Sequence, residues 1–236
     1  MGRMSAPRRL LLLLAAVLAL AGCAGTSSEA RPVAAEGWRG IEPSPVPERP
    51  SFVLTDTEGR PYDFRAETGG RPTYVFFGYT DCPDECPTAM ADLAAALRRT
   101  DPELRDDVTV VMVTTDPERD DAARMRSWLD QFSTEFVGLT GTQEQVDAAQ
   151  AAAGIRPAQR GGEVATLPGR PDEHYHKPGT APHSHDRPLG YAVEHANVIF
   201  AYDVDDRLPV LYPSGATAAD LAADLPRLAT PAAERS

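Results

Sequence analysis

The fold is decided by residues 74–87, which read YVFFGYTDCPDECP. The first six of these residues form a continuous apolar and aromatic run, as expected for a buried central strand. Residues 88–99 follow with apolar side chains at helical spacing on one face. The stretch therefore predicts a strand that turns directly into a helix. In open α/β sheets, functional sites lie at such turns, beyond the carboxyl ends of the strands.

Further strands and helices alternate on both sides of this unit. The predicted strands span 52–54, 62–64, 108–113, 191–193, 197–203 and 208–212, and the further predicted helices span 121–132, 142–153 and 216–228. The helix at 142–153 opens on a Thr-x-x-Gln capping box and stops at Gly154, a C-terminal cap. The alternation predicts an α/β domain with helices on both faces of a central mixed sheet, to which the final hairpin adds antiparallel strands.

The two cysteines of the turn carry the chemistry. Cys82 and Cys86 are four residues apart at the start of a helix, so both sulfurs can lie on one face. A helix N-terminus favours negative charge and lowers the pKa of a thiol. The pair can close a disulfide or bind one metal ion, and two thiolates select soft ions such as Cu(I). The alternative is a small structural disulfide, which would stabilise little because it closes a short loop.

Residues 77–87 resemble the Cys-Pro-x-x-Cys-Pro signature of the Sco/SenC copper chaperones. Residues 115–120 resemble that family's Asp-Pro-x-Arg-Asp segment, and residues 193–195 resemble its Val-Asp-His segment. The likeness runs from about residue 51 to 228 and implies a thioredoxin-like fold. It also implies that His195 joins Cys82 and Cys86 as a copper ligand. Glu194 replaces the usual Asp, a change that removes no ligand.

The resemblance implies an extracytoplasmic copper metallochaperone that assists assembly of the copper centre of cytochrome c oxidase. Its expected cargo is Cu(I), Cu(II) or both. Its expected partners are the oxidase subunit carrying that centre, other copper chaperones and thiol reductants. The alternative is a thiol–disulfide oxidoreductase that reduces the oxidase cysteines, a role that does not need His195. A thioredoxin-fold peroxidase would need Arg and Thr beside one cysteine, and the sequence offers only Thr80 and arginines without a distinctive position.

The N-terminal residues predict export and lipid attachment. Three arginines precede an apolar run at 10–21, which is too short to span a bilayer comfortably and is typical of a signal peptide. The run ends in Leu-Ala-Gly-Cys23, which resembles a bacterial lipobox; the alternative is an ordinary signal peptide with Cys23 incidental. We therefore expect a signal peptide at 1–22, a flexible tether at 23–50 and the Sco-like domain at 51–230. The protein would then be anchored to the extracytoplasmic face of the cell membrane.

Charge and histidine content add two further expectations. The net charge of −12 excludes nucleic-acid binding through a basic patch and electrostatic attachment to anionic lipid, so the membrane would be held by acyl chains. An insert at 156–188 is rich in Pro, Gly and His and interrupts the pattern. Its four histidines form two His-x-His pairs, which suit accessory metal capture or are incidental in a solvated loop. These histidines are His174, His176, His183 and His185.

Overall fold

The computed structural model describes residues 37–160 and 193–235 of the 236-residue chain. The predicted signal peptide, Cys23 and the four histidines of the insert lie outside the described residues. No helix within the described ranges is long and apolar enough to cross a membrane.

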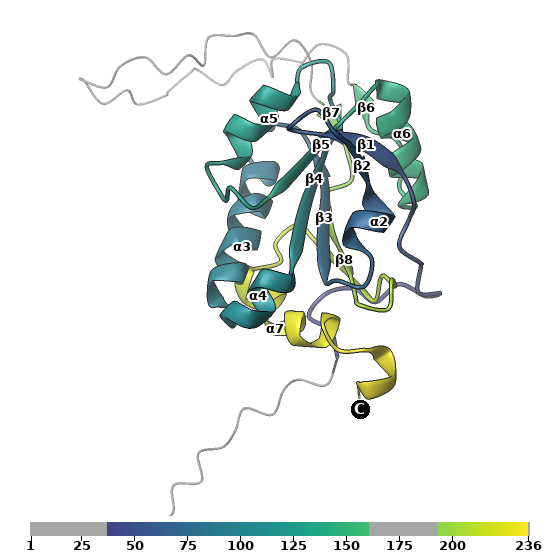
Figure 1. Cartoon of the computed structure of the whole chain (residues 1–236), viewed down its shortest axis with the longest axis vertical. Coiled ribbons are helices and arrows are strands. Elements are labelled where there is room, and N and C mark those ends of the chain that lie inside the picture. The colour runs from purple at the N-terminus through teal and green to yellow at the C-terminus, as the bar shows by residue number, and fades with distance from the viewer. Residues whose placement is uncertain (1–36, 161–192, 236) are drawn as a thin grey trace, which may run out of the picture. The chain divides into compact units, whose positions relative to one another are not determined.

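A seven-stranded mixed sheet forms the centre of the domain, in the order β2-β1-β5-β4-β3-β8-β9 (Figure 1). Its central strand β3 pairs parallel to β4 and antiparallel to β8, and β4 pairs parallel to β5. A separate two-stranded sheet joins β6 to β7. The strands are β1 (Val53–Asp56), β2 (Pro61–Asp63), β3 (Thr73–Gly78), β4 (Thr109–Thr114), β5 (Val137–Thr140), β6 (Gln159–Arg160), β7 (Val193–Glu194), β8 (Val198–Tyr202) and β9 (Val210–Pro213).

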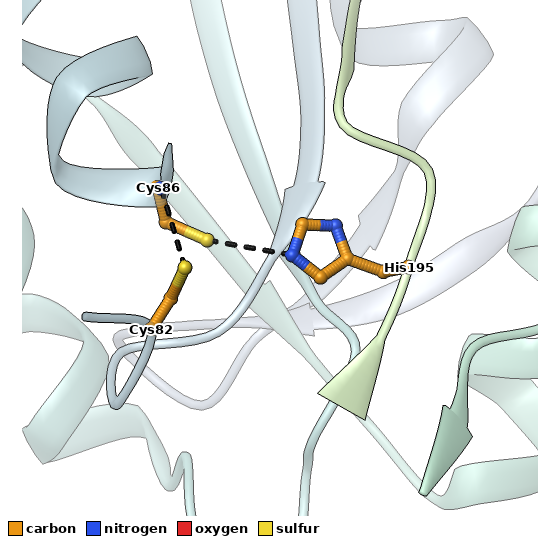
Figure 2. A group of neighbouring side chains, drawn as sticks. All are labelled: Cys82, Cys86 and His195. Atoms are coloured by element: carbon orange, nitrogen blue, oxygen red, sulfur yellow. Dashed lines mark hydrogen bonds between the residues drawn. The ribbon is translucent and has the colours of Figure 1, made fainter. Parts of the chain in front are cut away.

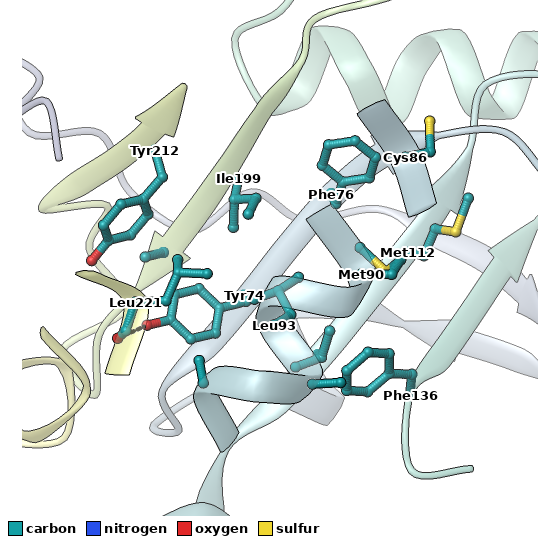
Figure 3. Close-up of a cluster of buried hydrophobic side chains, with 14 of the residues drawn as sticks. Tyr74, Phe76, Cys86, Met90, Leu93, Met112, Phe136, Ile199, Tyr212 and Leu221 are labelled. Carbon is teal, nitrogen blue, oxygen red and sulfur yellow. Dashed lines mark hydrogen bonds between the residues drawn. The ribbon is translucent and has the colours of Figure 1, made fainter. Parts of the chain in front are cut away.

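Helices cover both faces of the sheet. They are α2 (Phe64–Thr68), α3 (Glu85–Arg99), α4 (Pro102–Asp107), α5 (Ala122–Leu129), α6 (Gln143–Ala152) and α7 (Ala218–Leu228), followed by a short 3-10 turn, η1 (Ala232–Glu234). Alternate residues of β3 enter two separate apolar clusters, because successive side chains of a strand point to opposite faces. Tyr74 and Phe76 pack with α3 and α7 in one cluster, part of which Figure 3 shows. Val75 and Phe77 pack with α6 in the other.

This architecture confirms the predicted thioredoxin-like α/β fold with a mixed sheet. The capping box of α6 is present, since Thr142 and Gln145 bond each other's backbone N–H groups. Gly154 follows α6 at φ +79°, the left-handed conformation expected of a C-terminal cap. The sequence analysis missed β5, α2 and α4, which are four to six residues long and too short to show a hydrophobic period.

Residues 37–50, which the composition assigned to the flexible tether, instead pack against the domain. Ile41 exchanges two backbone hydrogen bonds of 2.8 Å with Leu211 on the edge strand β9. Arg49 is 1 % exposed, and its guanidinium donates to Asp206, Thr68 and two backbone carbonyls. Composition did not predict this packing, because the segment has no apolar face. Backbone pairing with β9 and the buried Arg49 hold it on the domain. Residues 37–50 therefore belong to the folded domain, which was predicted to begin at residue 51.

Candidate metal centre

The β3–α3 turn places the two cysteines. Cys82 lies in the turn, where its N–H donates to the carbonyl of Tyr79, and Cys86 lies in the first turn of α3. The backbone N–H of Cys86 points at Cys82 Sγ at 3.4 Å, so an unpaired donor of the helix N-terminus faces the sulfur. Both residues are free cysteines. The helix begins three residues before the predicted start at 88, which places Cys86 inside it.

His195 approaches this turn from the connection between β7 and β8 (Figure 2). Its Nε2 lies 3.6 Å from Cys86 Sγ, and its Nδ1 lies 3.3 Å from the carbonyl oxygen of Ala196. The tautomer with its proton on Nε2 donates toward the sulfurs, whereas the tautomer with its proton on Nδ1 offers an Nε2 lone pair to a metal ion. The rings of Phe76 and Tyr79 meet the imidazole edge-on, at centroid distances of 6.0 and 5.6 Å. Aromatic packing thus fixes the plane of the ring.

One ligand atom from each of Cys82, Cys86 and His195 lies within 4.8 Å of the other two. Cys86 is fully buried, whereas Cys82 and His195 are partly exposed. Within the described ranges, these three residues form the one group of at least three His, Cys, Asp or Glu side chains close enough to hold a metal ion. The open side of the group therefore lies at Cys82 and His195, where an incoming ligand can reach a bound ion.

The two thiols have opposite acidities. A hydrogen bond from the Cys86 side chain, together with hydrogen bonds from His195 and from the backbone, lowers the pKa of Cys82 to about 4. The same sulfur–sulfur hydrogen bond, reinforced by burial, raises the pKa of Cys86. At neutral pH the pair therefore carries one thiolate, on Cys82, and one proton, on Cys86. A metal ion that binds both sulfurs has to displace that proton.

Several residues support the turn through contacts that were not predicted from the sequence. Thr80 donates from its backbone N–H and hydroxyl to the buried carboxylate of Asp120, at 2.9 and 2.5 Å. Arg124 on α5 donates from Nε to Thr80 Oγ1 at 2.7 Å and forms an ion pair with Asp81. Burial raises the pKa of Asp120, and its hydrogen bonds from Thr80 oppose that rise. The loop that leads into Cys82 is thus tied to the β4–α5 segment.

Some of these supporting residues could have been identified from the sequence, and others could not. Asp120 belongs to the quoted 115–120 segment and could have been identified there, whereas nothing in the sequence singles out Arg124. The sequence analysis also found no specific arginine to accompany Thr80, and the structure supplies Arg124. The far end of that guanidinium is held by Asp81.

Comparisons with known proteins identify relatives of this chain. The SCO1/SenC family model matches residues 42–166. SenC of Rhodobacter capsulatus is 38% identical over 100 residues, covering 39% of this chain and 45% of that protein. The mouse mitochondrial SCO2 homologue is 39% identical over 97 residues, covering 40% and 37%. The chain thus spans about half or less of the length of these curated relatives.

Solved structures extend the likeness across most of the fold. Bradyrhizobium japonicum ScoI, solved with copper bound, aligns with a TM-score of 0.58 and 26% identity, covering 78% of this chain and all of that one. Apo Sco1 of Thermus thermophilus aligns with a TM-score of 0.63 and 26% identity, covering 82% and 98%. The family model ends before His195, so the role of this residue rests on the local motif and on geometry. The family model matches more than half of the sequence, and the chain belongs to the SCO1/SenC family.

Proposed function

We propose that the protein binds one copper ion through Cys82, Cys86 and His195 and delivers it to the copper centre of cytochrome c oxidase. The observation that carries this proposal is the convergence of three ligand atoms within 4.8 Å. Two of these atoms come from residues 109 positions apart in the chain, Cys86 and His195. Structures of related proteins at 26% identity support copper as the cargo, since one of them was solved with copper bound.

The donor set suits Cu(I). Two thiolates and one imidazole are soft or borderline ligands, and a three-coordinate site leaves room for an incoming thiolate. Because Cys82 is already a thiolate at neutral pH, loading needs to remove only the proton of Cys86. Unloading would proceed by ligand exchange at the partly exposed Cys82 and His195, where a cysteine of the acceptor reaches the ion first. His195 also supplies the nitrogen ligand for Cu(II).

A specific observation also favours a second candidate function. Cys82 combines a pKa of about 4 with partial exposure, and the sulfur of Cys86 lies next to it. A reactive thiolate beside a buried resolving thiol is the arrangement of thiol–disulfide oxidoreductases. In this role the protein would reduce the cysteines of the oxidase before copper enters. His195 separates the two functions, because a third metal ligand is not required for disulfide exchange.

The proposed place of action is the extracytoplasmic face of the cell membrane, with a lipid on Cys23. The apolar run at 10–21 and the following Leu-Ala-Gly-Cys motif support export and acylation. The acceptor would be the oxidase subunit that carries the copper site, and other copper chaperones or thiol reductants would load or reduce the protein. The four histidines of the 156–188 insert would gather copper for the centre.

The test compares His195→Ala with wild type in cells that lack the chromosomal copy, grown in copper-depleted medium. Copper delivery predicts that His195→Ala cells lose most oxidase activity and recover it when copper is added. Cys82→Ser is the control, since it removes function under both candidate roles. Full oxidase activity from His195→Ala in depleted medium would contradict copper delivery and favour the reductase.

The role of the insert is tested in the same cells by deleting residues 161–188, which leaves β6 and its pairing with β7 in place. Copper capture by its histidines predicts a loss of oxidase activity at low copper only. An equal loss at high copper would instead indicate a structural role for the insert.

A further inference from the structure

A small pocket of about 130 Å³ opens beside the metal centre, between the start of α3 and the loop from β9 to α7. Its apolar lining includes Phe76, Ile199 and Tyr212. Phe76 is shared with the metal centre, because its ring also meets the imidazole of His195 at 6.0 Å. A molecule that occupies this pocket would therefore be separated from His195 by the ring of Phe76.

Two carboxylates line the same pocket, and among the described residues no lysine or arginine does. Glu85 and Asp92 are seven residues apart on α3, so both face the pocket from one side of the helix. Glu85 accepts a hydrogen bond of 2.5 Å from the amide of Asn197, which also bonds Ser214 Oγ at 2.6 Å. Asp92 has no hydrogen bond or ion pair to any residue within 37–160 and 193–235. The pocket therefore combines an apolar floor with two carboxylates that form no ion pair with a cation in the described part of the chain.

We propose that this pocket binds a lysine or arginine side chain of the copper-receiving partner, close to the partner's cysteines. A long cationic side chain fits this lining because its methylene stem can lie on the apolar floor while its head meets Glu85 and Asp92. Opposite charges also fix the register of a complex and raise its association rate, and this chain carries a net charge of −12. The inference rests on the proposed function, since it assigns the partner chemistry of the same site.

The test uses synthetic peptides with two cysteines four residues apart. A lysine is scanned from two to six positions away from the nearer cysteine, and a matched set carries glutamine there. The full chain, purified in detergent and loaded with Cu(I), is mixed with each peptide, and copper in the separated peptide is measured over time. We expect the best lysine position to accept copper about fivefold faster than its glutamine match, as one partly exposed ion pair allows. Since salt screens such pairs, 0.5 M NaCl should remove most of this preference.

Three variants test whether the preference for lysine peptides arises at this pocket. Asp92→Asn, which removes one of the two carboxylates, should reduce the lysine preference to about twofold. Ala216→Trp, which fills the pocket, should abolish the preference. Glu103→Gln, which removes the same charge from α4 outside the pocket, should keep it. Copper loading should stay at the wild-type level in all three, because no metal ligand is changed. A wild type without preference at any lysine position, or a preference that survives in both pocket variants, would overturn the proposal.

A binding experiment separates this proposal from the proposed function. The same peptides, with serine in place of cysteine and a fluorescent label, are titrated with the copper-free protein. The pocket predicts the lysine preference in this binding experiment, even though no copper moves. A protein that binds the lysine peptides preferentially but delivers copper to none of them would support the pocket and contradict copper delivery. Equal binding of the lysine and glutamine peptides would overturn the pocket.

Discussion

Gly78, the last residue of β3, leaves no room for a side chain beside the metal centre. A Cβ at this position would lie 2.5 Å from Cε1 of Phe76 and 2.9 Å from Sγ of Cys86. Both neighbours are fully buried, so neither can move without displacing other core atoms. Forcing one extra carbon into such a core costs about 1–3 kcal/mol. We therefore expect Gly78→Ala to lower the free energy of unfolding of the copper-free protein by about that amount.

Gly78→Ala should also lower the affinity of the protein for copper. In the copper-free protein the sulfur of Cys86 can shift away from the new methyl group only by displacing neighbouring core atoms, and a bound ion would oppose even that shift. If copper binding costs about 1.4 kcal/mol more in the variant because of this steric conflict, the affinity falls about tenfold. Urea unfolding measures the stability, and competition with a Cu(I) chelator of known affinity measures the binding.

Gly138→Ala in β5 is the matched control. Its Cβ would lie 2.8 Å from Cδ1 of Leu129 and 2.9 Å from Cγ2 of Thr57, and neither of these residues belongs to the metal centre. This variant should lose a similar amount of stability and keep wild-type copper affinity. A Gly78→Ala protein with unchanged stability and unchanged affinity would refute the close packing of Gly78 against Cys86.

Three further predictions concern the thiols, the anchor and the loop. Since the pKa of Cys82 is lowered to about 4, its alkylation by iodoacetamide should keep a nearly constant rate from pH 8 to pH 5 and fall by half near pH 4. A rate that drops about tenfold per unit below pH 8 would show an ordinary thiol; Cys86→Ala, which removes the side-chain hydrogen-bond donor, should move toward that behaviour. A clickable fatty acid should label the wild type in cells and leave Cys23→Ala unlabelled, and persistent label in Cys23→Ala would exclude acylation at this residue. Arg124→Gln removes the donor to Thr80 Oγ1 and should lower the free energy of unfolding by about 1 kcal/mol, measured in urea; an unchanged value would show that this contact does not stabilise the fold.

The local parts of the fold could be predicted because their determinants are close together in the sequence. An unbroken apolar run followed by helical spacing was enough to place β3 and α3, and the Thr142–Gln145 box was enough to start α6. The cysteine pair was found for the same reason, since both residues lie in one turn. Short elements such as β5 were missed because four residues carry little periodic signal.

The long-range parts could not be derived from local patterns. His195 reaches the cysteines across 109 residues, and only the family resemblance pointed to it. Arg124 supports the turn from α5, a different element, and its position in the sequence does not distinguish it from other surface arginines. The segment at 37–50 folds onto the sheet through backbone pairing and the buried Arg49, which composition alone does not indicate.

We propose that Cys82, Cys86 and His195 together hold the copper, and X-ray absorption spectroscopy of the Cu(I)-loaded protein can test this ligand set. Copper is counted per chain, and the wild type is compared with His195→Ala. We expect one copper per chain with two sulfur neighbours and one nitrogen neighbour in the wild type, and loss of the nitrogen neighbour in His195→Ala. A wild-type spectrum without two sulfur neighbours, or one that is identical in His195→Ala, would exclude this ligand set.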